Sequence, residues 1–157
     1  KNKTLTYYWD NKIKSPTVIK EYKLKVGNIF PSIEVPTKNG IWTNAGLNKI
    51  VVINWWATSC LPCIREIPIL NKLVDKYQDQ NIDFIAIVWD ENNHSNFIEK
   101  HPFKYLQGFT TRELTDLCGD KFPRHFVVDR DGTILLNKLG GSNQIGDELG
   151  SILSSKF

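Results

Sequence analysis

Two cysteines that lie three residues apart, Cys60 and Cys63, are the residues of this chain best suited to chemistry. They follow an apolar, strand-like run from Ile50 to Trp56, so a helix that begins at Cys60 places the first sulfur at a helix N-terminus. Unpaired N–H groups and the helix dipole stabilise a negative sulfur there, and the thiolate is the reactive form of cysteine. Cys63, one turn on, can attack a mixed disulfide on Cys60 and close an intramolecular bridge. The spacing predicts dithiol redox chemistry.

The same spacing also occurs in metal sites and in structural disulfides, which are the two alternatives to a redox pair. A structural bridge that closes so short a loop would restrain the unfolded chain little. Zinc would need two more Cys or His ligands, normally as a second close pair. The remaining candidates are isolated from one another along the chain: His94, His101, Cys118 and His125. We therefore predict a redox-active Cys60–Cys63 pair with no metal and no external cofactor.

Size and charge narrow the function classes. The chain has 157 residues, 41% of them hydrophobic and 24% charged, which fits one globular domain. No stretch approaches the roughly 18 apolar residues of a membrane span. The net charge of +3 is too small to indicate nucleic-acid binding, and residues 1–25 hold seven lysines against Asp10 and Glu21. We predict a basic N-terminal arm or tether over residues 1–25 and a single domain over 26–157, acting as a monomer without nucleic acid.

The arm leaves several readings open. Residues 17–22 alternate weakly and could add an edge strand, while the basic residues suit either a solvated arm or a contact with a membrane surface or partner. The chain lacks an initiator Met and a signal-like apolar region, so we expect that a targeting segment or membrane anchor was removed. Three cysteines suit a cytosol with catalytic thiols or an oxidising compartment with a maintained dithiol.

Hydrophobic periodicity predicts an α/β domain. Ile50 to Ile53 is a β-branched apolar run typical of a central strand buried on both faces. Apolar residues then recur at helical spacing from about Cys60 to Tyr77, with Pro68 inside, and residues 82–89 are again strand-like, so 50–89 form a βαβ unit with parallel strands. The other expected elements are a hairpin turning at Asn39-Gly40, helices at 94–101 and 111–118, a strand at 103–106, a hairpin of 126–129 with 133–136, and a closing helix around Ile145 to Leu153.

Several separate motifs, in this order, resemble the thioredoxin superfamily, and within it the TlpA/ResA-like (AhpC/TSA- and redoxin-like) thiol-disulfide oxidoreductases of bacteria. The resemblance covers about residues 26–153. Its carriers are Val26-Gly27-Asn28 with Phe30-Pro31, the run from Val51 to Ala57 leading into Cys60-Leu61-Pro62-Cys63, then Arg65-Glu66-Ile67-Pro68, and Phe122-Pro123 before the stretch from Phe126 to Gly132.

The resemblance implies a thioredoxin-like fold: a mixed β-sheet with helices on both faces, a C-terminal hairpin antiparallel to the βαβ strands, and an N-terminal β-hairpin extension. It implies an enzyme that exchanges disulfides with protein cysteines in the reducing direction, with Cys60 attacking and Cys63 resolving. It also implies a cis bond between Phe122 and Pro123 that faces the cysteines and presents the Phe122 backbone to a substrate polypeptide. The substrate-binding residues would be Trp56, Leu61, Pro62, Phe122, Pro123 and Arg124.

Partners and location also follow from the resemblance. The partners would be a protein disulfide or thiol substrate and an upstream thiol donor. The protein would act outside the cytoplasm of a bacterium, in the periplasm or tethered to the membrane, in cytochrome c maturation or in general extracytoplasmic reduction.

Two rival functions stay open at this stage. One is a thiol peroxidase, although the Pro-x-x-x-Thr-x-x-Cys setting is absent, and the other is a copper chaperone that uses Cys60, Cys63 and one histidine.

The chain departs from thioredoxin at positions beside the cysteines. Asn54 stands where thioredoxin has a buried Asp, and Glu66 matches an acidic residue of ResA-like proteins, so Glu66 is either the proton acceptor or an exposed first-turn residue that favours the helix dipole. Arg124 or His125 could lower the pKa of the Cys60 thiol, or point to solvent. Cys118 is predicted to be either a buried apolar cysteine or a thiol with a regulatory or mixed-disulfide role.

Overall fold

The chain was examined as a computed structural model, which describes residues 24–157. Almost all of the proposed arm, including its candidate edge strand at 17–22, lies outside these residues. The strands are β1 (Glu34–Thr37), β2 (Gly40–Thr43), β3 (Ile50–Trp56), β4 (Ile82–Val88), β5 (Leu106–Phe109), β6 (Arg124–Val128) and β7 (Ile134–Leu139). The helices are α3 (Leu61–Lys76), α4 (His94–Lys100), α5 (Arg112–Cys118) and α6 (Ile145–Ser154), with a 3₁₀ turn at Glu91–Asn93.

The described strands form one mixed sheet in the order β2-β1-β5-β4-β3-β6-β7. Strand β3 runs parallel to β4 and antiparallel to β6, and all seven of its residues are buried, as predicted for a central strand of continuous apolar sequence. The βαβ unit and the antiparallel C-terminal hairpin are confirmed. The turn at Asn39-Gly40 joins β1 to β2, which pair antiparallel.

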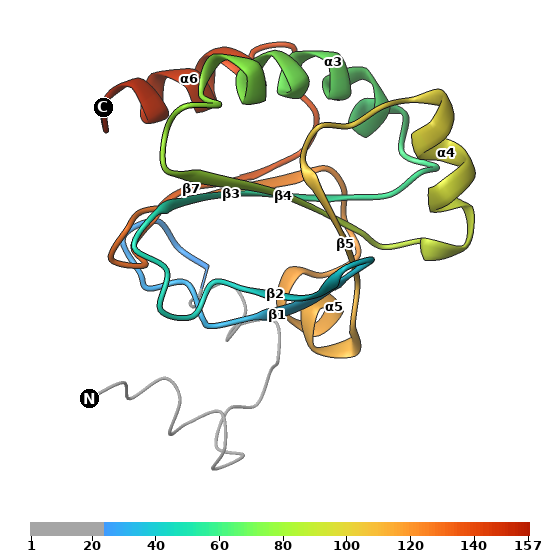
Figure 1. Cartoon of the computed structure of the whole chain (residues 1–157), viewed down its shortest axis with the longest axis horizontal. Coiled ribbons are helices and arrows are strands. Elements are labelled where there is room, and N and C mark those ends of the chain that lie inside the picture. The colour runs from blue at the N-terminus through green and yellow to red at the C-terminus, as the bar shows by residue number, and fades with distance from the viewer. Residues whose placement is uncertain (1–23) are drawn as a thin grey trace.

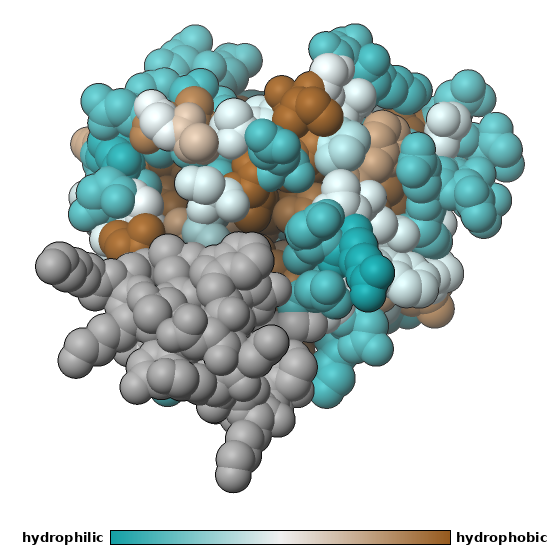
Figure 2. Space-filling model, turned by 90° about the horizontal axis from the view of Figure 1, so that it is seen from below, coloured by the Kyte–Doolittle hydropathy of each residue, from teal (hydrophilic) through white to brown (hydrophobic). Residues whose placement is uncertain are grey.

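Helices cover both faces of the sheet (Figure 1), as the thioredoxin-like fold requires. Helices α3 and α6 lie side by side on one face, where Leu70 and Leu149 are fully buried over Val52 and Val127. Helix α5 covers the other face, and its Leu114 packs with Val51 and Phe126. The side that carries β1, β2 and α5 is seen in Figure 2, where the described hydrophobic residues form small groups among hydrophilic ones.

The predicted strand at 103–106 is wrong in position, since β5 begins only at Leu106. Phe103 and Tyr105 lie in the segment that leads into β5. Their side chains are buried in the cluster beneath α3, which explains the apolar pattern without a strand. The strand itself includes Gly108, where an added Cβ would lie 2.4 Å from Val35 Cγ1. A glycine is therefore needed for the close approach of β1, and it weakens the strand pattern in the sequence.

Asp129, at the end of β6, ties the hairpin to the C-terminus. A hydrogen bond from Lys156 Nζ (2.6 Å), aided by the N–H of Arg130, lowers the pKa of the Asp129 carboxyl below its ordinary value. A lowered folded-state pKa adds stability that is present above the unfolded value and is lost as pH falls through the folded value. We expect Asp129→Asn to flatten the loss of stability between about pH 5 and pH 2, measured by urea unfolding. Lys156→Ala should do the same. If both variants lost stability at low pH as steeply as wild type, the Asp129–Lys156 bond would not be the source of this pH dependence.

Candidate active site

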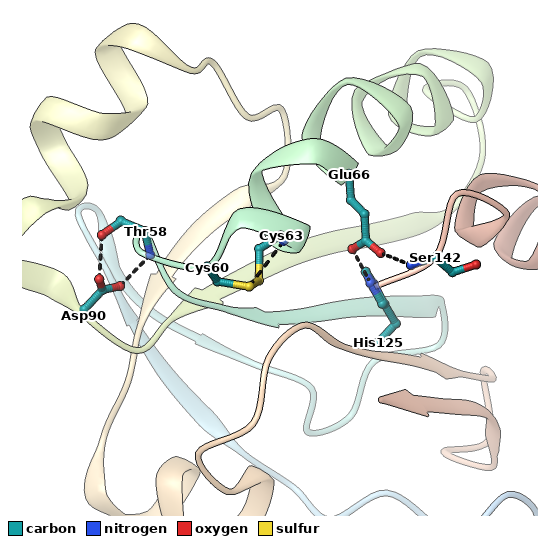
Figure 3. The surroundings of a disulfide bond; sticks show 7 residues. All are labelled: Thr58, Cys60, Cys63, Glu66, Asp90, His125 and Ser142. Atoms are coloured by element: carbon teal, nitrogen blue, oxygen red, sulfur yellow. Dashed lines mark hydrogen bonds and ion pairs between the residues drawn. A yellow bond between two sulfur atoms is a disulfide. The ribbon is translucent and has the colours of Figure 1, made fainter. Parts of the chain in front are cut away.

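The two cysteines form a disulfide at the start of α3 (Figure 3), with an S–S length of 2.10 Å and a Cα–Cα distance of 5.3 Å. Cys60 is the N-cap residue, in extended conformation, and its Sγ accepts a hydrogen bond from the Cys63 N–H at 3.3 Å. Pro62 sits in the first turn, where its missing N–H leaves no intrahelical bond unmade. The first sulfur therefore occupies the helix N-terminus, as the spacing predicts.

The two sulfurs differ in exposure. Cys63 is only 1% exposed, whereas Cys60 is half-buried. The difference arises because α3 turns Cys63 toward the sheet, on the same face as Ile67 and Leu70, while the N-cap stays at the surface. A bulky reagent or a substrate disulfide can thus reach Cys60 but not Cys63.

Asp90 fixes the loop that precedes Cys60, and sequence reasoning missed it. Its carboxylate accepts the Thr58 N–H at 2.7 Å and the Thr58 hydroxyl at 2.5 Å (Figure 3). Asp90 lies two residues after the end of β4, so the segments that follow two adjacent parallel strands are joined at the same end of the sheet. The available signal was its place at the carboxyl end of β4, beside the end of β3.

We expect Asp90→Ala to cost about 1–3 kcal/mol of stability, since it leaves two donors of Thr58 without their acceptor. It should also change the rate at which Cys60 of the reduced protein is alkylated, because the N-cap loop loses its anchor. Urea unfolding and timed labelling measure both effects. Asp75→Ala is the control, since Asp75 pairs with Lys104 at more than half exposure and such pairs contribute about 0–1 kcal/mol. Equal effects of the two substitutions would contradict the anchoring role.

Glu66 is buried, with 3% exposure, and lies beyond the first turn of α3. The reading of Glu66 as an exposed first-turn residue is therefore wrong. Its Oε2 accepts a hydrogen bond from His125 Nε2 at 2.9 Å, and its Oε1 accepts the Ser142 N–H at 2.9 Å (Figure 3). Glu66 points into the protein because it shares the buried face of α3 with Cys63, three residues earlier.

The loop between β7 and α6 packs over the start of α3. The Gly140 N–H donates a hydrogen bond to the Pro123 carbonyl at 2.8 Å, and the Ser142 N–H, two residues later, donates to Glu66. Between them, Gly141 approaches so closely that an added Cβ would lie 2.6 Å from Pro62 Cβ. Three successive residues thus contact the cis-proline segment, the residue between the cysteines and the buried carboxylate.

The two residues after the proline point to opposite faces of the sheet. His125 is fully buried and faces Glu66, so it does not point to solvent. Arg124 is partly buried, donates to Asn137 Oδ1 (2.9 Å) and to the Cys118 carbonyl (3.1 Å), and lies over the ring of Phe126. Cys118 is buried in the cluster beneath α5, which agrees with the reading of an apolar cysteine.

The bond between Phe122 and Pro123 is cis, as the resemblance implies. Leu61 is 64% exposed, whereas the ring of Trp56 is fully buried against Phe97 and Phe103, so its side chain offers no surface to a substrate. Pro123 is also buried. Trp89, which sequence reasoning did not select, is 44% exposed and contacts Phe122. Leu61 and Trp89 are therefore exposed apolar side chains near this end of the sheet, beside the partly buried Phe122.

Tyr105 is the remaining titratable group close to the site. Burial raises the pKa of Tyr105 well above its ordinary value, and the charge of Glu66 raises it further. Its hydroxyl therefore stays protonated. Within residues 24–157, no three His, Cys, Asp or Glu side chains are arranged to hold a metal ion. Over the same residues, no helix is both long and apolar enough to cross a membrane.

Comparison with known proteins decides the family. Residues 26–136 match the family model described as the AhpC/TSA family. The chain belongs to this family. It is 30% identical over 122 residues to the thiol-disulfide oxidoreductase ResA of Bacillus thuringiensis subsp. konkukian, covering 74% of this chain and 70% of the relative. It is 44% identical over 103 residues to ResA of Halalkalibacterium halodurans, covering 61% and 57% respectively.

Solved structures support the same fold for this AhpC/TSA-family chain. The thioredoxin domain of a thiol-disulfide oxidoreductase from Bacteroides vulgatus superimposes with a TM-score of 0.71 at 20% identity, covering 82% of this chain and 98% of that one. A thiol:disulfide interchange protein from Bacteroides sp. gives 0.70 at 20% identity, covering 84% and 92%. With its CxxC pair, the protein is a ResA-like thiol-disulfide oxidoreductase of the thioredoxin superfamily.

Proposed function

We propose that this oxidoreductase reduces disulfides of protein substrates outside the bacterial cytoplasm, using Cys60 as nucleophile and Cys63 as resolving thiol. The observation that supports this most strongly is the difference in exposure between the two sulfurs at the N-terminus of α3. The half-buried Cys60 at the N-cap can meet the substrate, and the buried Cys63, within bridging distance, can meet only Cys60.

The exchange proceeds in two steps. The Cys60 thiolate attacks one sulfur of the substrate disulfide, the substrate S–S bond breaks, and the second substrate sulfur leaves as a thiolate that takes a proton from water. Cys63 then gives up its proton and attacks the Cys60 sulfur, which breaks the mixed disulfide, releases the first substrate sulfur as a thiolate and forms the Cys60–Cys63 bond. An upstream thiol donor returns the pair to the dithiol. Two electrons pass to the substrate in each cycle, and no external cofactor takes part.

Glu66 is the proposed proton acceptor for Cys63. The carboxylate sits one turn along the same buried face, where side chains three residues apart lie within about 5–6 Å at their Cβ atoms. Bulk water reaches neither group readily, since Cys63 and Glu66 are 1% and 3% exposed. A base inside the protein therefore has to take the proton before Cys63 can attack.

A substrate polypeptide would pair with the backbone at Phe122 and cover the apolar side chains around Cys60. Leu61 and Trp89 flank this position and have 64% and 44% exposure. Pro62, which lies between the two cysteines in the sequence, adds surface beside Cys60. Arg124 supports the Phe122–Pro123 segment from the other face of the sheet. Backbone pairing gives affinity with little sequence preference, which suits an enzyme of several substrates. Apocytochrome c, with its haem-binding cysteine pair, is one proposed substrate, and the alternative is general reduction of extracytoplasmic proteins.

The similarity to ResA supports a location outside the cytoplasm, with the protein tethered through a segment that precedes the domain. We propose that residues 1–25 act as a basic arm or tether and that the domain at 26–157 works as a monomer.

The proposed function is tested by reduction of a protein disulfide under a thiol donor, with wild type and Cys60→Ser compared. Wild type should turn over and Cys60→Ser should not. Equilibration with glutathione buffers then gives the potential. A reducing role predicts a value closer to the roughly −270 mV of thioredoxin than to the roughly −120 mV of DsbA. A DsbA-like value would reverse the proposed direction, and no turnover by wild type would contradict the function.

A further inference from the structure

The sheet carries a second polar residue beneath α3 that faces the Glu66–His125 pair. Asn54 of β3 lies directly opposite His125 of β6 in the antiparallel register. Both project toward α3, because Asn54 lies between Val52 and Trp56 and His125 lies two residues before Val127, all in the cluster on that face. Opposed side chains on one face of a sheet have Cβ atoms about 4.5–5.5 Å apart. Asn54 and His125 are 1% and 0% exposed.

These two residues hold complementary atoms that lack a partner. His125 Nε2 is bonded to Glu66, but His125 Nδ1 is buried with no hydrogen-bond partner among residues 24–157, and Asn54 Oδ1 is in the same condition. Buried polar atoms are nearly always paired, so two unpaired atoms on residues that lie opposite each other call for an explanation. An N–H on Nδ1 would supply a donor and Asn54 Oδ1 an acceptor. The surroundings thus suit an imidazolium, with one N–H toward Glu66 and the other toward Asn54.

We propose that His125 is a positioning residue that carries the positive charge needed to neutralise Glu66 when the buried Cys63 becomes a thiolate. This inference rests on the proposed function and deepens it. Cys63–SH beside a Glu66 carboxylate and a neutral His125 becomes Cys63–S⁻ beside the same carboxylate and a charged His125. One proton moves from the Cys63 sulfur to Glu66 and from there to His125, so the carboxylate that accepts the proton is restored and the total charge is conserved. The thiolate then forms next to a neutral ion pair instead of next to a bare anion.

The other charges around His125 do not take over this role. Lys138 of β7 is opposite His125 in register, but it is paired with Glu148 of α6. Tyr105 keeps its proton, because burial and the charge of Glu66 raise its pKa. The Ser142 N–H holds Glu66 Oε1 without adding charge. His125 is therefore the group against Glu66 that can gain a positive charge within the described part of the chain.

The chain offers a matched control in His94. It is the other buried histidine, 2% exposed, its Nδ1 also lacks a partner among the described residues, and its ring packs against Trp56. Its Nε2, however, is bonded to the neutral Gln107 at 3.0 Å. The two histidines share burial and an unpaired nitrogen and differ in whether they face a carboxylate.

The test uses Cys60→Ser with Cys118→Ser, so that Cys63 is the thiol that titrates. In this background, ultraviolet thiolate absorbance is followed against pH for three proteins: His125 intact, His125→Gln and His94→Gln. Glutamine keeps a donor near the position of His Nε2 but cannot take a proton. We expect His125→Gln to lower the thiolate fraction of Cys63 at neutral pH about tenfold or more, because the carboxylate is no longer neutralised. His94→Gln should titrate like its parent.

A second measurement needs no substitution at the histidine. Nuclear magnetic resonance of the imidazole rings in wild type should show His125 holding its proton to a higher pH in the dithiol form than in the disulfide form, with His94 unchanged. Superimposable thiolate curves for His125→Gln and its parent, or a His125 titration independent of redox state, would overturn the inference. Because wild-type turnover is measured separately, such a result would leave the proposed function standing, whereas an inactive wild type would remove both.

Discussion

Mixing the Cys63→Ser variant with a protein disulfide should trap a covalent complex through Cys60, while Cys60→Ser should trap none. The half-buried Cys60 can attack a substrate, but without Cys63 the mixed disulfide has no internal thiol to resolve it. Turnover should fall by at least about 10²-fold in Cys60→Ser, since its nucleophile is lost. Non-reducing electrophoresis with mass mapping of the bridged peptide measures the complex, and a coupled thiol donor measures turnover.

Cys118→Ser is the matched control for this experiment. Cys118 is as buried as Cys63, with 3% and 1% exposure, but it lies in the cluster beneath α5, on the opposite face of the sheet from Cys63. Its replacement should leave both trapping and turnover unchanged. A complex that forms through Cys63 in the Cys60→Ser variant would show that the roles of the two sulfurs are reversed.

Glu66→Ala should be the most destabilising single substitution at the site, with a loss of about 3–5 kcal/mol in the free energy of unfolding. The reason is that two donors, the buried His125 Nε2 and the partly buried Ser142 N–H, lose their acceptor at once. The β7–α6 loop should loosen with it, since Ser142 is held by this carboxylate. Urea unfolding of the oxidised protein measures the effect, and the slope of the transition reports any change in compactness.

Glu148→Ala provides the comparison, because Glu148 also pairs with a cation, Lys138, but at about one-third exposure. Exposed pairs contribute about 0–1 kcal/mol, so this variant should stay close to wild type. Glu66→Gln should fall between the two, since it keeps one acceptor oxygen. If Glu66→Ala were no more destabilising than Glu148→Ala, the buried carboxylate would not be holding the loop and the histidine.

The sequence was sufficient to predict the frame of the fold. The β-branched run at 50–53 predicted the central strand, the apolar period across 60–77 predicted α3, and the segments 126–129 and 133–136 predicted the C-terminal hairpin. These signals are strong because each follows one local rule of burial or turn chemistry. The same holds for Cys60, whose place at the N-cap follows from where the strand stops and the helix starts.

The contacts between distant segments could not be predicted in this way. Nothing local to Asp90 shows that it binds Thr58, and nothing local to His125 shows that it meets Glu66, 59 residues away. Trp56 was assigned to the substrate surface by its place in a motif, but its face of β3 is set by the packing of α4 and of Phe103 over it. Register and side-chain direction decide these points, and both depend on the assembled sheet.

The amide of Ser142 has a consequence for following this enzyme in solution. Ser142 lies in a surface loop, yet its N–H is hydrogen-bonded to a carboxylate that is 3% exposed and lies one turn from Cys63. Its exchange with deuterium should therefore be slow while Glu66 accepts the bond and faster whenever that bond opens. Comparing exchange in the disulfide and dithiol forms would make one backbone position a built-in reporter of events at the buried sulfur, without a label or a substituted residue.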